Sequence, residues 1–333
     1  MACLEDIDSI INFICNHWQS DHIYVKNPSL FRYDFVRGNE LTLGILELES
    51  RIEGIFGYFY YNESPMPDIG GMLWRVSDKA EKIVPLAGVK LRNYVLHNIP
   101  HRFFGSPGAG AQTEAIYRVI KQQWIPMQQY LGKAEDDPWP EFVRLPQKSL
   151  QNVPGSQSLE LVSRVCDLKS INPLIFEHQT PIKDYSYLLW RYFFNPFHHY
   201  YIWKMEINSE ESLLVVRMQR IANHTIMRVI DYIGNIGSAA QVLAAVFFQM
   251  RKQHRFAYVD FVCSGFDSAK FTEIGFHALD FEDKATSAPN LFEPLVLQSK
   301  QVFANANFGF DNVTMVRGNG DQDRPNTQTS WSC

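Results

Sequence analysis

Several side chains in the sequence can exchange a proton near neutral pH. Asp231 interrupts the apolar run "RVIDYIG", where a buried carboxylate needs a partner: a ligand amine, the backbone or Arg228. His22 stands in "DHIYV", and His198 and His199 are adjacent in "NPFHHYY". If these two lie in a strand, at most one faces a pocket, because neighbouring side chains point to opposite faces. A general base accepts a proton directly or through water, so Asp231, His199 and His22 are the candidates.

A run of small residues stands where a helix is expected to begin. The strand "GGMLWRV" leads into a predicted loop, residues 77–85, and then into a predicted helix that starts with Leu86-Ala87-Gly88 and ends near residue 98. The first amides of a helix lack intrahelical acceptors, and the helix dipole favours an anion beside them. Small residues let phosphate approach such amides. The alternative is an ordinary surface helix with a glycine near its start.

Length and composition indicate a folded protein with room for two domains. The chain has 333 residues, of which 46% are hydrophobic and 20% charged. Its 31 Lys and Arg against 36 Asp and Glu give 31 − 36 = −5, which disfavours a nucleic-acid or acidic-membrane partner. Five cysteines without CxxC spacing predict neither disulfides nor a zinc site. No basic leader and no apolar run of membrane-spanning length occur, so we expect a cytoplasmic protein that needs no metal.

The predicted elements form two similar series. In the first half, a helix over 7–18 precedes two strands within 40–62, the strand 70–76, the helix 86–98, a short strand in "RFFGSPGAG" and a helix in "AQTEAIYRVIKQQW". A linker rich in proline and glycine is predicted from "GKAEDDPWPEF" to "LQNVPGSQSLE". In the second half, a helix in "LVSRVCDLKSIN" precedes a strand, a hairpin over 212–234, a helix over 238–254, the strand "FAYVDFVCS" and a short helix ending at Gly275.

This order of elements resembles the acyl-CoA N-acyltransferase superfamily, often called GNAT. More narrowly, "HWQSDHIYVKNPSLFRYDF", "EGIFGYFYYN", "LLWRYFFNPFHHYYIW" and "MRVIDYIGN" are similar to tandem-GNAT sugar N-acyltransferases encoded with bacterial surface-polysaccharide (O-antigen) genes. The resemblance implies an α/β (α+β) fold of two tandem GNAT-like domains, with mixed sheets flanked by helices. It implies an acyl-CoA half, residues 1–145, and a degenerate half for the sugar nucleotide, residues 146–317. The polar composition of residues 318–333 predicts a disordered tail.

The resemblance implies a CoA site in the first half. In such folds the pantetheine arm lies along a splayed strand, here Trp74-Arg75-Val76, and the pyrophosphate lies at the next helix start, here Leu86-Ala87-Gly88-Val89. A backbone N–H near Val76 would hold the thioester oxygen. The superfamily loop usually reads Arg/Gln-x-x-Gly-x-Gly/Ala, whereas residues 83–88 lack the leading Arg or Gln. Lys82 or Lys79 would have to supply the missing charge.

The resemblance also implies a general acid. The helix after the next strand usually carries a tyrosine that protonates the departing CoA thiolate, and Tyr117 falls at this place. Phe271 stands at the matching position of the second half, whose loop "GNIGSAAQ" also lacks the phosphate motif. The first half is therefore the expected donor half. The alternative for Tyr117 is a packing residue on an amphipathic helix.

The implied reaction moves an acetyl or 3-hydroxybutyryl group from CoA to a nucleotide-linked amino-deoxysugar, for example dTDP-3-amino-3,6-dideoxygalactose. Arg191 would pair with the diphosphate, and Tyr192 and Tyr201 would lie against the nucleotide, unless this aromatic segment fills the interface between the halves. Two alternatives stay open. One is a tandem-GNAT aminoacyl transferase that uses aminoacyl-tRNA, which the acidic charge disfavours. The other is a non-catalytic acyl-CoA-binding protein, which the missing Arg or Gln favours.

Overall fold

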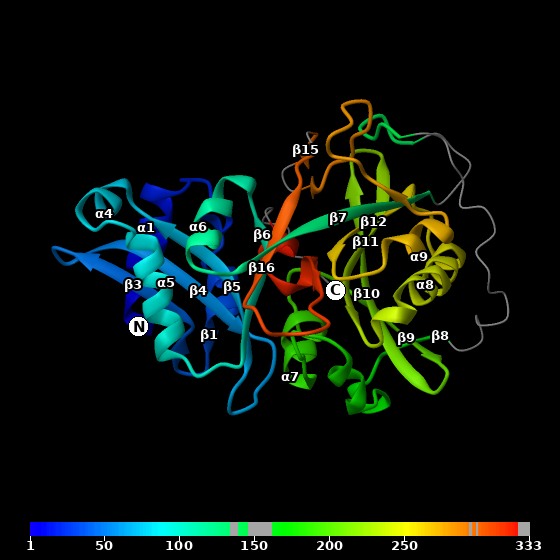
Figure 1. The fold of residues 1–333 in the computed structure, drawn as a ribbon, viewed down its shortest axis with the longest axis horizontal. Helices are drawn as coiled ribbons and strands as arrows, with labels where there is room; N and C mark the ends of the chain where they lie inside the picture. Colours follow the sequence, from blue (N-terminus) through cyan, green and yellow to red (C-terminus); the bar gives the residue numbers. More distant parts are fainter. Residues whose placement is uncertain (134–138, 146–161, 293–294, 298, 326–333) are drawn as a thin grey trace.

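A computed structural model describes residues 1–133, 139–145, 162–292, 295–297 and 299–325. Most of the predicted linker and the end of the chain from residue 326 lie outside these residues. The described chain forms a long mixed sheet with helices on both faces (Figure 1). The predicted mixed α/β fold is confirmed.

The sheet joins strands from distant parts of the sequence. Its order is β3 (Leu43–Leu48), β4 (Arg51–Tyr60), β5 (Asp68–Val76), β6 (Phe103–Ala109), β16 (Val302–Ala306), β7 (Gln123–Lys133), β12 (Tyr258–Ser264), β11 (His224–Ile233), β10 (Glu210–Ile221), β9 (Tyr201–Ile207) and β8 (Val162–Arg164). The first part of β7 pairs with β16, and its second part pairs with β12. Since β16 also pairs with β6, a late segment of the chain completes the early part of the sheet. A division at residue 145 therefore does not divide the strands into two separate sheets.

Helices cover the first part of the sheet on both faces. One face carries α1 (Ile7–His17), α2 (Ile23–Lys26) and α3 (Pro28–Phe35), and the other carries α4 (Asp78–Ile83), α5 (Ala87–Asn98) and α6 (Glu114–Val119). The faces differ because strand side chains alternate: Ile55 and Phe59 of β4 pack in the core of α1 and α3, whereas Phe56 packs with α5. A bulge at Met72 of β5, opposite Gly57 and Tyr58 of β4, interrupts the alternation in β5, so Met72 and Leu73 both pack in the core of α1 and α3.

The second part of the sheet has an order of strands and helices similar to that of the first part. The hairpin β10–β11 is followed by α8 (Ala239–Gln253), β12, α9 (Ser268–Glu273) and the short β13 (His277–Ala278), which pairs with β7. The helix α8 packs against β10 and β12, and α7 (Tyr185–Leu188) belongs to the same core as α1 and α3. The remaining short strands are β1 (Val36–Arg37), β2 (Glu40–Leu41), β14 (Leu291–Phe292) and β15 (Leu295–Val296).

Three local predictions are wrong. The predicted loop 77–85 contains α4, because Ser77 caps a helix by accepting the Ala80 N–H through Oγ at 3.0 Å. The predicted helix in "LVSRVCDLKSIN" is instead β8 followed by the 3₁₀ helix η4 (Leu168–Ser170), since β8 finds a partner in β9. His198 and His199 precede β9 rather than lie in it, so strand alternation does not govern them.

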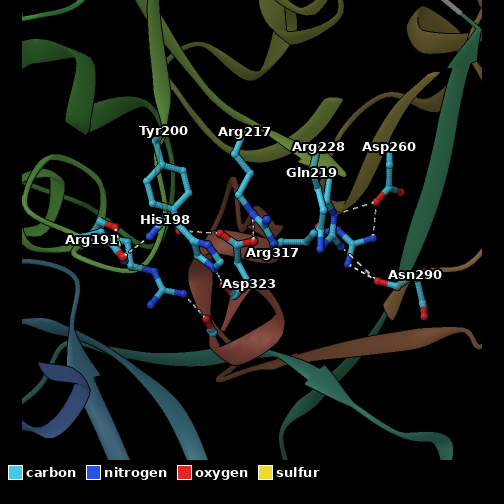
Figure 2. A network of polar contacts seen from close by, with 12 residues as sticks. Arg191, His198, Tyr200, Arg217, Gln219, Arg228, Asp260, Asn290, Arg317 and Asp323 are labelled. Atoms are coloured by element: carbon cyan, nitrogen blue, oxygen red, sulfur yellow. Dashed lines mark hydrogen bonds and ion pairs between the residues drawn. The ribbon is translucent and has the colours of Figure 1, made fainter. Parts of the chain in front are cut away.

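The predicted disordered tail is also wrong over its described part. β17 (Met315–Val316), η8 (Arg317–Asn319) and η9 (Asp321–Asp323) continue the ordered chain, and Asn319 and Asp323 are 0% and 2% exposed. Figure 2 shows why: Arg317 donates to Asp260 Oδ2 at 2.9 Å, and Asp323 accepts from Arg217 at 2.7 Å. The polar side chains that predicted disorder instead pair with buried charged side chains from other parts of the chain.

The same network predicts a pH dependence of stability. Burial lowers the pKa of His198 to about 3, and Arg217 adds to this effect. Because an unfolded histidine titrates near ~6.5, the unfolded state binds more protons between that pH and about 3. The free energy of unfolding should therefore fall as the pH drops through this window, by up to about 1.4 kcal/mol per pH unit from this one residue.

Urea unfolding at pH 7, 6 and 5 checks this. We expect His198→Gln to flatten the pH dependence, whereas His97→Gln, a change at an exposed helix position, should leave it as in the wild type. Equal slopes for the wild type and His198→Gln would contradict a neutral, buried His198.

Candidate active site

β5 and β6 diverge to form a wedge in the first part of the sheet. They pair in parallel only at Asp68–Phe103 and Ile69–Phe104. Beyond this point β5 stays paired with β4, and β6 continues alongside β16. Ser106 of β6 donates a hydrogen bond to the Gly71 carbonyl across the start of the divergence. Trp74, Arg75 and Val76 therefore lie where β5 has left β6.

The helix α5 begins at Ala87. Leu86, just before it, has a left-handed backbone with φ of 59°, and Ala87 and Gly88 are buried. The Gly88 N–H donates to Glu81 Oε1 at 3.1 Å, and the Gly88 carbonyl accepts from Trp74 Nε1 at 3.2 Å. A carboxylate thus occupies the position expected for a phosphate oxygen.

The surrounding lysines do not fill the expected role in this conformation. Lys79 pairs with Glu49 at 2.8 Å, and Lys82 lies exposed on α4. Arg75 donates to the His17 carbonyl at 3.0 Å, on the face that carries α1. An anion at Gly88 would have to displace Glu81 and recruit one of the lysines.

For the CoA donor that the sequence resemblance implies, we therefore expect Glu81→Gln to tighten binding about fivefold to tenfold. The change removes a like charge beside the incoming phosphates, and an amide competes less strongly for the Gly88 N–H. Isothermal titration with CoA measures the effect, with Glu273→Gln, an exposed residue of α9, as the matched control. Unchanged or weaker binding in Glu81→Gln would show that the phosphates do not reach Gly88.

Tyr117 lies on α6 beside the wedge. Its ring meets Trp74 edge-on, with centroids 6.1 Å apart, and stacks on Trp124 of β7 at 5.2 Å. Burial raises the pKa of Tyr117 to about 12, and nearby Arg92 opposes this rise. The hydroxyl is therefore protonated at neutral pH and has a proton to give.

Arg92 is a residue that the sequence interpretation missed. It is 4% exposed on α5, its guanidinium lies 4.8 Å from the centre of the Phe104 ring, and burial lowers its pKa to about 10. Within the described chain, its Nε and Nη2 have no hydrogen-bond partner. Two groups beside Tyr117 share this condition, Trp124 Nε1 and Gln122 Oε1. A sequence signal existed, since an arginine at the fourth position after Gly88 falls on the buried face of the helix.

Unsatisfied buried polar atoms are rare in folded proteins, and a cluster of them is typical of a place that a ligand or ordered water completes. Arg92 supplies a positive charge close enough to act on the Tyr117 hydroxyl, Trp124 a donor next to the Tyr117 ring, and Gln122 an acceptor next to the Tyr117 backbone. We call these four residues the Tyr117 cluster. The cluster offers a hydrogen-bond donor and an acceptor to a polar chain that carries amides, and a positive charge to an anion at the end of that chain.

The corresponding wedge of the second part is filled by the chain itself. β11 pairs with β12 in parallel over Ile226–Val229 and then diverges from it. β17 pairs with the end of β12 at Cys263 and Ser264. A Cβ placed on Gly318 of η8 would lie 2.9 Å from the Ile230 carbonyl, so no space remains there. On α9, Phe271 is buried against Tyr130 and Phe261.

Asp231 lies in a buried ion pair. Its Oδ1 accepts from Lys183 Nζ at 2.6 Å and from the Tyr232 N–H at 2.8 Å, and its Oδ2 accepts from the Tyr192 hydroxyl at 2.6 Å. Arg228, the alternative partner, instead contacts Asp260 at 3.3 Å. Both carboxylate oxygens of Asp231 are thus engaged inside the protein.

The two candidate histidines, His22 and His199, lie away from Tyr117 and have other neighbours. His22 caps α2 by accepting the Tyr24 N–H through Nδ1 at 3.3 Å, and burial lowers its pKa to about 4. A neutral ring that accepts at Nδ1 carries its proton on Nε2, so no ring nitrogen is left to accept another. His199 is exposed beside β9, near the opposite end of the sheet from β5, with Arg164 as its neighbour. The structure brings neither histidine next to Tyr117.

The expected substrate residues are dispersed. Arg191 is buried and donates to the Gly320 carbonyl, and Tyr192 donates to Asp231. Tyr201 begins β9 and lies under the Arg164 guanidinium, 4.4 Å from the ring centre. The alternative that this aromatic segment fills the interior is favoured for Arg191 and Tyr192.

The fold is that of a GCN5-related N-acetyltransferase. A protein of that description from Anabaena variabilis ATCC 29413 aligns with a TM-score of 0.53 and 11% identity over 91% of this chain and 71% of its own. A conserved protein of unknown function from Enterococcus faecalis V583, described as a probable N-acyltransferase, gives a TM-score of 0.53 and 11% identity over 91% of this chain and 70% of its own. No family model and no curated protein sequence matches the chain.

None of the helices in the described residues is both long and apolar enough to cross a membrane. No group of three or more His, Cys, Asp or Glu side chains in the same part of the chain is placed to hold a metal ion.

Proposed function

We propose that the protein transfers an acyl group from CoA to a primary amine, with the donor bound in the first part of the sheet. One observation carries this proposal. The wedge between β5 and β6 lies beside the start of α5 and the Tyr117 cluster, whereas the equivalent wedge between β11 and β12 is filled by β17 and η8. Trp74, Val76 and residues 86–89 would hold the donor in this proposal.

In the proposed reaction, the free amine attacks the thioester carbonyl carbon and the C–S bond breaks. Tyr117 gives its hydroxyl proton to the leaving sulfur and regains a proton from water afterwards. The positive charge of Arg92 stabilises the negative charge that develops on the sulfur and on the tyrosine oxygen during this transfer. The amine loses its proton to water, because none of the candidate bases Asp231, His22 and His199 has a free acceptor beside Tyr117. No metal takes part in these steps.

The specific acceptor that the sequence resemblance supports is a nucleotide-linked amino-deoxysugar, such as dTDP-3-amino-3,6-dideoxygalactose. The internal contacts of Arg191 and Tyr192 do not support their role in holding its diphosphate and base. We therefore propose the amine as the acceptor group and the sugar nucleotide as the first candidate to test.

The test follows thiol release from acetyl-CoA and 3-hydroxybutyryl-CoA with a panel of dTDP- and UDP-aminosugars and simple amines. Amine-dependent release supports the proposal. A Cβ on Gly88 would lie 3.1 Å from Trp74 Nε1, so Gly88→Leu should weaken CoA binding at least tenfold. CoA binding without turnover on any amine would instead favour a non-catalytic acyl-CoA-binding protein, and turnover only with aminoacyl-tRNA would favour the aminoacyl transferase.

A further inference from the structure

A cavity of about 320 Å³ lies between α3, β4 and the segment 184–194. This volume is at the small end of ligand pockets, which span roughly 300–1,000 Å³. Its walls are mainly aromatic side chains, and three carboxylates and one guanidinium also line it. The aromatic residues are Tyr33, Phe59, Tyr60, Tyr187, Trp190 and Phe194.

The aromatic walls are held in place by the backbone. Trp190 Nε1 donates to the Tyr33 carbonyl at 3.2 Å, and the Tyr33 hydroxyl donates to the Trp190 carbonyl. The two rings stack with centroids 6.3 Å apart, and Phe59 lies 5.7 Å from Trp190. Protein cations already lie over three of the lining rings, with Arg37 4.7 Å from the Tyr60 centroid, Arg191 5.5 Å from Trp190 and Lys183 5.8 Å from Tyr187. The fixed aromatic wall is therefore one that accommodates positive charge.

The charges of the cavity are unbalanced. Asp34, Glu63 and Asp184 line it, and Arg37 is the guanidinium among the lining residues. Arg37 pairs with Glu63 at 3.0 Å. Asp184 is used as a helix cap, since it accepts the N–H groups of Tyr187 at 2.8 Å and of Glu63 at 2.7 Å.

Asp34 is the third carboxylate of the cavity, and it neither pairs with Arg37 nor caps a helix. It is 7% exposed, and its Oδ2 accepts from the Tyr24 hydroxyl at 2.7 Å. No ion pair within 4.0 Å is found for it among the residues that the structure places. Burial raises the pKa of Asp34 to about 6 even though Arg191 and Arg324 oppose the rise, so their charges do not compensate this carboxylate fully. A cation entering the cavity would supply the missing charge.

The cavity lies near the proposed donor site, on the other face of the sheet. Phe59 forms its inner wall, and a Cβ placed on Gly70 of β5 would lie 2.4 Å from the Phe59 ring. Gly70 directly follows Ile69, the last residue of β5 that pairs with β6. The cavity is therefore one aromatic layer from the point where the wedge opens, whereas α5 and Tyr117 approach this point from the opposite face.

From this geometry we infer that the cavity binds an ammonium group carried on a compact ring, with its charge at Asp34. The Phe59 ring separates this ammonium from the wedge, so it is not the amine that attacks the thioester, and the inference goes beyond the proposed function. The negative lining excludes a phosphate or diphosphate from the cavity, so any phosphorylated part of a ligand has to remain outside it.

The test measures binding of cyclohexylamine and cyclohexanol, a pair that differs in the charged group, to the full chain without CoA. We expect the amine to bind at least tenfold more tightly than the alcohol. Asp34→Asn should abolish this preference, and Glu114→Gln, which removes a half-buried carboxylate of α6 that does not line the cavity, should retain it. Equal affinities for amine and alcohol in the wild type, or a preference that survives in Asp34→Asn, would overturn the inference.

A second variant keeps the location testable if Asp34→Asn does not fold. Phe194 is 70% exposed at the rim, so Phe194→Ala should leave the fold intact and weaken both ligands about threefold or more. Affinities unchanged by Phe194→Ala would place the ligand elsewhere and overturn the inference. Acetyl transfer is assayed separately with acetyl-CoA. Binding of the amine without transfer to any amine would sink the proposed function and leave the site, whereas transfer without the amine preference at Asp34 would sink the site alone.

Discussion

Replacing Asp231 with alanine should lower the free energy of unfolding by about 3–5 kcal/mol, as is typical when one partner of a buried ion pair is removed. Lys183 is 2% exposed, and burial already lowers its pKa against the influence of Asp231. Without Asp231 its amine would have to remain charged without a partner or lose its proton. The Tyr192 hydroxyl would also lose its acceptor. Urea unfolding at pH 7 measures the change.

Two controls separate this structural role from the catalytic role considered for Asp231. Glu273→Ala, at an exposed position of α9, should change stability by less than about 0.5 kcal/mol. The double change Asp231→Leu with Lys183→Met should restore most of the loss, since apolar residues of similar volume can replace a buried pair. A stable Asp231→Ala protein that has lost only its activity would return Asp231 to the role of general base.

Local patterns in the sequence were sufficient for most of the fold. The run from "GGMLWRV" to Asn98 gave a strand and a helix because alternation, small residues and a closing Asn-Ile-Pro all act within a few residues. The pairing of β16 with β6 and β7 could not be found in this way, because it joins residues about 200 positions apart. The ordered end of the chain escaped for a related reason. Arg317 and Asp323 are acceptable inside the protein only because Asp260 and Arg217 meet them there.

The candidate site was predictable to a lesser degree. The resemblance to the GNAT superfamily pointed to Tyr117, and the small residues at a helix start pointed to Gly88; both residues contact Trp74 beside the wedge. Polarity alone pointed to Asp231 and His22, and both turned out to be engaged in internal contacts. A titratable residue in an apolar run shows that some partner exists, but the partner's identity is a property of the tertiary structure.

Replacing Tyr117 with phenylalanine should slow amine-dependent thiol release by about 10²–10⁴-fold, the usual contribution of a general acid. The aromatic contacts with Trp74 and Trp124 persist in phenylalanine, so CoA affinity should stay within about twofold of the wild type. Single-turnover rates and CoA titration measure the two effects separately. Tyr94→Phe, a change at an exposed tyrosine of α5, is the matched control and should alter neither. An unchanged rate in Tyr117→Phe would remove the acid role.

Arg92 allows a second test of the acid role, because its charge would stabilise the same leaving thiolate that Tyr117 protonates. Arg92→Met keeps much of the side chain's volume and removes the charge, so it should slow thiol release in the same assay. If Tyr117 and Arg92 stabilise one leaving thiolate, the double variant should be little slower than Tyr117→Phe alone. Losses that multiply would mean that the two residues act at different steps. In that case, the unpaired Nε and Nη2 of Arg92 would serve the binding of CoA rather than the departure of its sulfur.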